Sequence, residues 1–278
     1  MNSITPVITA LFIYPVKSCG SIHLKASTLD AAGLTHDREW MVAARLTGKF
    51  VSQRDAPRLA LIRPSIAGGH LTLSAPGRSP LVVALDHGGA QVAVEIWNHS
   101  CNALDAGPDA AEWFSELVGF PVRLVRFDPR HRRLSNLDWT DGVEAPNRFS
   151  DGYPLLVLGC ASPAALNERL RIALPMNRFR PNIVVDGTEA HDEDRWRSFQ
   201  AGAAAIRLVK PCVRCEITTT DQDTGVRSDT AEPLMTLATY RTDPRMQGGI
   251  TFGQNAIVTH GSGTTIQVGQ AIEPEWNF

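Results

Sequence analysis

Cysteine is scarce in this chain, and its few cysteines do not suggest a disulfide framework. The 278 residues include an odd set of five, namely Cys19, Cys101, Cys160, Cys212 and Cys215. Disulfide-stabilised secreted domains are much shorter and richer in cysteine, whereas a chain of this length can bury a large core without cross-links. We therefore expect free thiols and a reducing compartment, the cytoplasm.

Long apolar runs and a strong net charge are also lacking. The amino-terminal stretch MNSITPVITALFIYPVKS has no basic segment, and Pro6 and Pro15 interrupt its apolar residues. It therefore resembles neither a signal peptide nor a membrane span, and no later run is long enough to cross a bilayer. The formal net charge of -2 provides no field that would attract nucleic acid. We expect neither a membrane nor a nucleic acid as a partner.

One segment, VRLVRFDPRHRRL, is nevertheless locally basic. The simpler interpretation is a solvated face followed by a flexible loop. The alternative is a rim that attracts anions or docks an acidic protein partner. Its basic side chains are Arg123, Arg126, Arg130, His131, Arg132 and Arg133.

Short alternating segments dominate the chain and predict a mostly β fold of the α+β class, with barrels or curled sheets. Helices are expected at 108–119, where Gly119 is placed to end the helix, at 162–172, where Ser162 can cap and Pro163 can take the first turn, and around 232–241. The segment 128–152 is polar and rich in turn residues. We place a domain boundary there, giving domains 1–130 and 131–278.

Two cysteines stand three residues apart in KPCVRCEITTTD, and several roles are open to them. A structural zinc site needs four ligands, but there is no second CxxC and no HxxxH. A thioredoxin-like pair should open a helix, yet the β-branched EITTTD predicts a strand. On a strand, residues three apart point to opposite faces. Pro211 predicts a break that leaves Cys212 and Cys215 in a loop, where one sulfur can reach a ligand. Either thiol can also be a small buried hydrophobe.

Several cationic and polar residues lie at the ends of predicted strands. Arginine grips phosphate with two hydrogen bonds and lysine adds a point charge, so together they suit a phosphate-bearing ligand. Taken singly, each is an ordinary surface charge. In HDEDRW, we expect the acidic residues to face solvent around an anchoring Trp196. The strand-end residues are Lys17, Ser18, Arg38, Arg178, Arg180 and Asn182.

Seven motifs in order resemble one family. They are YPVKSCG, THDREWMV, FVSQRDAPRLALI, DGYPLLVL, RFRPNIVVDG, EDRW and CVRCEITTTDQDTG. The set is similar to the MOSC superfamily with its MOSC amino-terminal β-barrel domain, and more specifically to amidoxime-reducing components and their bacterial counterparts. The resemblance covers about residues 5 to 273. It implies a β-barrel-like amino-terminal domain followed by a MOSC β-barrel domain with a few short helices.

The resemblance also implies a site for the molybdenum cofactor, molybdopterin carrying molybdenum. Cys215 would be the metal ligand and the catalytic residue, while Cys212 would not bind the metal. Thiolate is a soft ligand that suits such a metal. The pterin and its phosphate would be held by Lys17, Ser18, Arg38, Arg180 and Asn182, with Asp151 and Tyr153 along the cofactor.

The implied reaction is the detoxifying two-electron reduction of small N-hydroxylated compounds, such as amidoximes, hydroxylamines or N-hydroxylated bases. Electrons would come from a separate protein, a ferredoxin, a flavin reductase or a cytochrome b5-type protein. Two alternatives remain open. One is sulfur transfer through a cysteine persulfide, and the other is a carrier that stores or delivers the cofactor.

Overall fold

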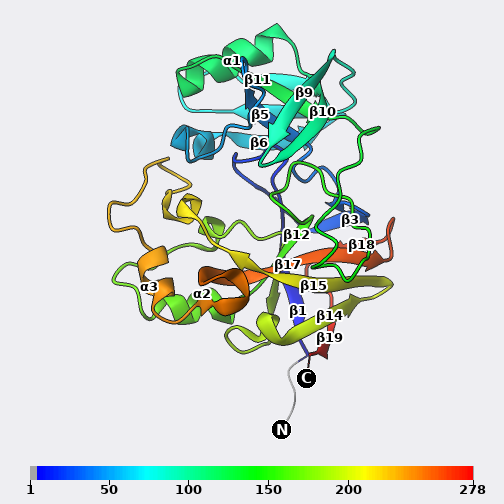
Figure 1. Ribbon diagram of the computed structural model, residues 1–278, viewed down its shortest axis with the longest axis vertical. Helices are drawn as coiled ribbons and strands as arrows, with labels where there is room; N and C mark the ends of the chain where they lie inside the picture. Colours follow the sequence, from blue (N-terminus) through cyan, green and yellow to red (C-terminus); the bar gives the residue numbers. More distant parts are fainter. Residues whose placement is uncertain (1–4, 278) are drawn as a thin grey trace.

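The computed structural model describes residues 5–277, which form two halves stacked along the long axis (Figure 1). The upper half contains two small sheets and α1 (Pro108–Val118). The lower half contains a nine-stranded sheet with α2 (Ala161–Asn167) and α3 (Leu234–Ala238) beside it. The predicted mostly β fold is confirmed. No helix in this part of the chain is long and apolar enough to cross a membrane.

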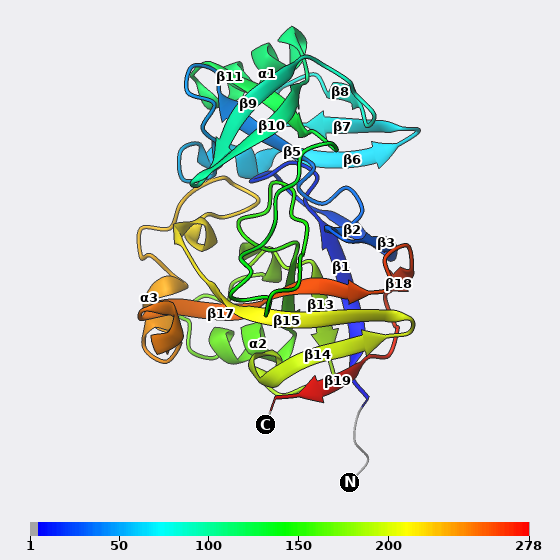
Figure 2. The same cartoon turned by 45° about the vertical axis from the view of Figure 1, so that its right-hand side comes forward.

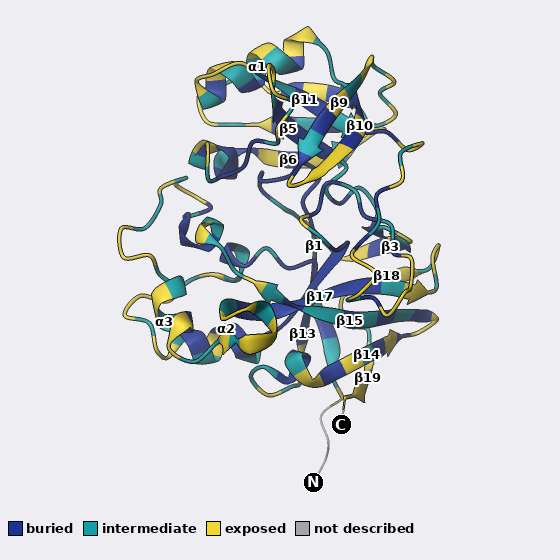
Figure 3. Cartoon of the chain, in the orientation of Figure 1, coloured by how far each residue is buried: buried dark blue, intermediate teal, exposed yellow. Residues whose placement is uncertain are grey.

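The nine-stranded sheet is the frame of the lower half. In spatial order its strands are β19 (Glu273–Trp276), β14 (Trp196–Ala201), β15 (Ala204–Val213), β17 (Gly249–His260), β12 (Leu155–Gly159), β13 (Ile183–Asp186), β1 (Val7–Ile13) and β2 (Ile22–Leu24), with β16 (Thr242–Asp243) on β17. Only β12 and β13 pair in parallel among these strands, and α2 lies on the crossover between them. Strand β12 is buried throughout, whereas β15 and β17 mix buried and partly exposed residues (Figure 3).

The upper half is built from two further sheets. The four-stranded sheet has the order β5 (Trp40–Ala44), β11 (Val122–Phe127), β10 (His99–Asp105) and β9 (Gln91–Ile96), and the three-stranded sheet has β6 (Arg63–Ala67), β7 (His70–Ser74) and β8 (Leu81–Ala84). Phe114 and Leu117 of α1 pack into their shared core. As predicted, Gly119 ends α1 with a left-handed backbone, φ 86°, a conformation that glycine adopts without strain.

The first strands of the chain are built into the lower half. Strand β1 pairs with β13, and β3 (Ala26–Asp30) pairs with β18 (Thr265–Gln267) and β4 (Gly33–Leu34). The chain enters the upper half only afterwards and returns through the irregular segment 128–154, which runs between the halves (Figure 2). The division at residue 130 stays a prediction.

Two expectations around the cysteine pair are wrong. Strand β15 does not break at Pro211 but continues to Val213, with shifts of register on either side of the proline. EITT forms a short 3-10 helix, η4 (Glu216–Thr219), rather than a strand. The hydroxyls of Thr218 and Thr219 donate to the carbonyls of Cys215 and Glu216, three residues earlier. Such local bonds compete with a strand ladder.

The prediction for HDEDRW is half right. Trp196 is buried, but so are Asp192 and Glu193 of the 3-10 helix η3 (Asp192–Arg195). Helix α2 also ends earlier than predicted, and Ser162 does not cap it, since its hydroxyl donates to Glu193. The remaining 3-10 helices are η1 (Pro57–Leu61), η2 (Met176–Arg178) and η5 (Pro244–Met246).

The arginine-rich segment does not form a basic rim. Arg133 is buried and donates to three backbone carbonyls, those of residues 148, 150 and 151. The other four guanidinium groups each pair with a carboxylate, so the cluster carries little free positive charge. The pairs are Arg123 with Asp105, Arg126 with Glu39, Arg130 with Asp128 and Arg132 with Glu144.

Candidate functional site

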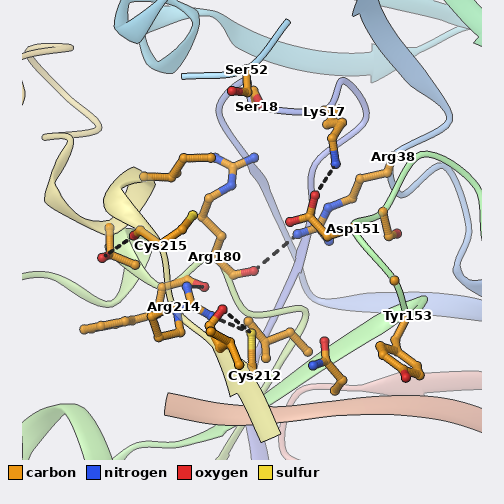
Figure 4. A pocket seen from close by; sticks show the side chains of 18 of the residues that line it. Lys17, Ser18, Arg38, Ser52, Asp151, Tyr153, Arg180, Cys212, Arg214 and Cys215 are labelled. Carbon is orange, nitrogen blue, oxygen red and sulfur yellow. Dashed lines mark hydrogen bonds and ion pairs between the residues drawn. The ribbon is translucent and has the colours of Figure 1, made fainter. Parts of the chain in front are cut away.

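A cavity of about 400 Å³ lies between the upper and lower halves and takes side chains from both. Its size is that of a small-molecule site. Every residue assigned to the site from the sequence lines this cavity, and Figure 4 shows most of them around it. These residues are Lys17, Ser18, Arg38, Asp151, Tyr153, Arg180, Asn182 and Cys215.

Strand directions explain why these distant segments meet. Because β12 and β13 are parallel neighbours, the residues preceding both strands reach the same edge of the sheet. Asp151 precedes β12 and Arg180 precedes β13. Strand β1 is antiparallel to β13, so the segment that follows it, with Lys17, arrives at that same edge. Three chain segments therefore converge on the cavity.

The walls of the cavity are strongly cationic. Six lining residues are lysine or arginine and one is a carboxylate, Asp151. Arg180 has no carboxylate partner among the described residues. Removal from water lowers the pKa of its guanidinium to about 10, only partly opposed by the nearby Tyr14. Such uncompensated charge favours an anionic ligand. The six cations are Lys17, Arg38, Arg54, Arg180, Lys210 and Arg214.

Tyr14 fixes two of these cations. The guanidinium carbons of Arg38 and Arg180 each lie 4.2 Å from the centre of its ring. Burial raises the pKa of the Tyr14 hydroxyl to about 12, so the ring stays neutral. Asn182 adds a second restraint, because its amide oxygen accepts a hydrogen bond of 2.9 Å from Arg38. The amide of Asn182 is thus committed to holding Arg38.

Lys17 and Asp151 form an ion pair on the wall of the cavity. The Lys17 ammonium donates to Asp151 at 2.6 Å and to the carbonyl of Phe149 at 2.9 Å. Burial lowers the pKa of Lys17, against the opposing effect of Asp151. Removal from water by itself would raise the pKa of the Asp151 carboxyl. The Lys17 ammonium and a hydrogen bond from Trp97 have a larger, opposite effect, so the pKa of Asp151 lies below its usual range. Asp151 is therefore ionised at neutral pH.

Three site residues have a left-handed backbone that side chains rarely adopt. The φ angles are 69° at Ser18, 44° at Arg38 and 56° at Arg180. Each such residue costs about 1 to 3 kcal/mol and persists only where its surroundings dictate it. Strain of this kind concentrates at functional sites.

The two cysteines line the cavity with different partners. Arg54 donates to the Cys215 sulfur at 3.3 Å, and Arg214 donates to the Cys212 sulfur at 3.0 Å. Both thiols are free. The expectation of a strand after Cys215 was wrong, but η4 has only four residues and does not provide the longer helix of a thioredoxin-like pair. Within residues 5–277, no group of three or more His, Cys, Asp or Glu is arranged to hold a metal ion.

The cavity is also lined by Tyr153 and by five residues that the sequence did not single out. The ring of Tyr153 packs in a small core with Ala145 and Ile257, and its hydroxyl is buried with no hydrogen-bond partner in the described part of the chain. Sequence reasoning did not single out Arg54, Trp97 or three further lining residues, although FVSQRDAPRLALI contains Arg54 and CVRC contains Arg214. No pattern marks Trp97. The three others are Phe50, Lys210 and Arg214.

Comparisons with known proteins agree with this architecture. Residues 5–121 match the MOSC N-terminal beta barrel domain, and residues 144–273 match the MOSC domain. The mitochondrial amidoxime-reducing component 1 of Mus musculus is 36% identical over 260 residues, covering 86% of this chain and 73% of that protein. The Homo sapiens component 1 is 35% identical over 243 residues, covering 84% and 72%. The Homo sapiens component 2 is 34% identical over 247 residues, with the same coverage.

Proposed function

Because the chain belongs to the family that joins a MOSC N-terminal beta barrel domain to a MOSC domain, we propose that it is a molybdenum-cofactor reductase of N-hydroxylated compounds. The names of its relatives, amidoxime-reducing components, give the reaction class. The observation that carries the proposal is that Cys215 lines a cavity together with six lysine and arginine side chains and a single carboxylate. A location in the cytoplasm remains part of the proposal.

The donor set of the cavity fits the molybdenum cofactor. A phosphate needs charged hydrogen-bond donors, and the guanidinium of Arg180 is desolvated without a carboxylate partner among the described residues. A molybdenum ion carried by the sulfurs of its pterin would suit a thiolate ligand from the protein, which is a soft donor. Cys215 would provide that thiolate, while Lys17, Ser18, Arg38 and Arg180 would bind the pterin and phosphate.

The reaction cleaves one N–O bond with two electrons and two protons, giving an N–H product and water. When bound, the cofactor supplies the two-electron chemistry. The chain orients both ligands and shields them from solvent. Asp151 is ionised at neutral pH, so it accepts hydrogen bonds and is not the acid that protonates the departing oxygen. Electrons come from a separate protein, a ferredoxin, a flavin reductase or a cytochrome b5-type protein.

The molybdenum content of the purified protein tests the proposal. The protein is produced in a host that makes the cofactor, together with Cys215→Ser and the matched control Cys212→Ser. We expect molybdenum near one per chain in the wild type and in the control, and loss in Cys215→Ser. With an artificial electron donor, benzamidoxime should be reduced by the wild type and by Cys212→Ser, which keep the metal, but not by Cys215→Ser. Absence of molybdenum from a host with a working pathway, or a persulfide mass on Cys215, would favour sulfur transfer instead.

A further inference from the structure

Trp97 occupies an unusual position at the turn between β9 and β10. Ile96 pairs with His99, so Trp97 and Asn98 alone connect the two strands. Trp97 has a φ of 54°, in a turn whose first residue is favoured to be glycine when φ is positive. A bulky side chain in this conformation is strained. Trp97 is also 40% exposed and lines the cavity, so burial in a core does not account for it.

The indole of Trp97 is fixed on several sides. Its ring lies 5.0 Å from the ring of Phe50, and the guanidinium carbon of Arg54 lies 4.8 Å from it. Its Nε1–H donates to Asp151 at 3.1 Å. A rigid aromatic side chain, with part of its surface left open to a cavity, loses little entropy when it binds a flat ligand.

The same contacts connect Trp97 to the sulfur of Cys215. Arg54 touches the indole and donates to the Cys215 sulfur at 3.3 Å. Arg54 has no carboxylate partner among the described residues. A ligand lying against Trp97 therefore sits one side chain away from Cys215. That spacing allows a flat body to rest on the indole while its polar end reaches toward the sulfur.

Resting on the function proposed above, we propose that Trp97 is a specificity-determining residue that takes the flat body of aromatic N-hydroxylated substrates. Small substrates such as hydroxylamine have no such body and do not use it. The residue acts on binding and leaves the chemistry at Cys215 unchanged. Trp97 thus favours aryl and heteroaryl amidoximes over small hydroxylamines at low substrate concentration.

Steady-state kinetics with two substrates tests this role. For Trp97→Ala in the cofactor-loaded protein, we expect the KM for benzamidoxime to rise about fivefold to tenfold, which matches the loss of an aromatic contact. The KM for hydroxylamine should rise much less, so that the ratio of the two KM values increases. Trp97→Phe keeps a ring but loses the bond to Asp151, and should restore most of the affinity. Trp276→Ala is the matched control, since Trp276 is 38% exposed beside Arg195 but does not line the cavity.

Calorimetric binding of benzamidoxime separates failure of this inference from failure of the proposed function. An unchanged KM and dissociation constant in Trp97→Ala, or an equal rise for both substrates, would overturn the role of Trp97. Wild-type protein that binds benzamidoxime without reducing it would overturn the proposed function. The dissociation constants of wild type and Trp97→Ala would still show whether Trp97 contributes to binding. Wild-type protein that neither binds nor reduces it would overturn both.

Discussion

Arg180 is held in an energetically unfavourable arrangement, with a strained backbone and a desolvated guanidinium group. Its backbone is left-handed, with a φ of 56°, and its guanidinium stacks on Tyr14 at 4.2 Å. Its hydrogen bond to Gln222 is 3.3 Å long, and no carboxylate among the described residues pairs with it. Strain and desolvation both oppose this arrangement. A bound anion would offset both effects.

Replacement of Arg180 by lysine tests whether it grips that anion. Lysine keeps the charge but cannot form the two parallel hydrogen bonds of a guanidinium with a phosphate. We expect Arg180→Lys to bind the cofactor about tenfold to a hundredfold less tightly, in line with about 1.5 to 3 kcal/mol for a charged hydrogen bond. The measurement is pterin and molybdenum per folded chain during dialysis.

Arg178→Lys is the comparison for this variant. Arg178 is a neighbouring buried arginine that pairs with Asp221 at 2.9 Å and does not line the cavity. Its replacement should leave the cofactor content per folded chain unchanged. Full occupancy in Arg180→Lys would remove Arg180 from the site.

The sequence predicted which residues line the cavity better than it predicted which neighbours they contact there. Lys17, Arg38 and Arg180 stand in motifs that the resemblance aligned, and all line the cavity. Asn182 does as well, but its amide holds Arg38, a role that depends on a neighbour 144 positions away. Trp97 was missed because its function depends on where a turn points, which no local pattern encodes.

At the scale of elements, local hydrogen bonds and shifts of strand register explain why the predictions for the segment around the cysteine pair were wrong. β-Branched residues after Cys215 predicted a strand, but threonine hydroxyls bonded to preceding carbonyls close a 3-10 turn instead. Pro211 predicted a break, yet β15 accommodates it between two register shifts, where a missing N–H does not interrupt the ladder. Composition alone does not distinguish these outcomes, whereas Gly119 correctly marked the end of α1.

The contact between η3 and α2 contains a buried acid that makes stability depend on pH. Glu193 is 1% exposed and accepts a hydrogen bond of 2.7 Å from Ser162, while its second oxygen has no hydrogen-bond partner among residues 5–277. Burial raises its pKa from 4.5 to about 7, with Asp194 adding to the effect. The folded chain therefore binds this proton more tightly than the unfolded chain. The contribution is fully favourable below pH 4.5 and declines as the pH rises to about 7.

Glu193→Gln should remove that decline. An amide keeps an acceptor for Ser162 and carries no charge, so its advantage over Glu193 should grow with pH. Between pH 5 and pH 8 we expect the difference in unfolding free energy between variant and wild type to shift by about 2 kcal/mol in favour of the variant. Urea unfolding at the two pH values measures it. Glu168→Gln, at an exposed position, is the control, and a parallel pH response of Glu193→Gln and wild type would contradict the assignment.

At the scale of the whole molecule, a small polar contact fastens the halves beside the cavity. Gln53 and Gln222 exchange two hydrogen bonds, of 3.0 and 2.9 Å, and both side chains are buried. Arg63 and Arg227 also reach across, to the carbonyls of Gln222 and of residues 53 and 54. Since the cavity lies between the halves, closing them and binding a ligand stabilise each other.

Loss of one amide should therefore weaken both properties. Gln222→Leu leaves buried polar atoms of Gln53 and one contact of Arg180 unsatisfied, which costs about 2 kcal/mol. We expect a matching loss in urea unfolding of the loaded protein and faster release of the pterin. Gln53→Leu combined with Gln222→Leu should recover part of the stability, because removing both partners leaves fewer orphaned groups. The recovery is only partial because the carbonyl of Ser18 still loses the amide of Gln53. If Gln222→Leu unfolds and releases pterin as the wild type does, the halves are held by other contacts, and cofactor retention depends on the cavity walls alone.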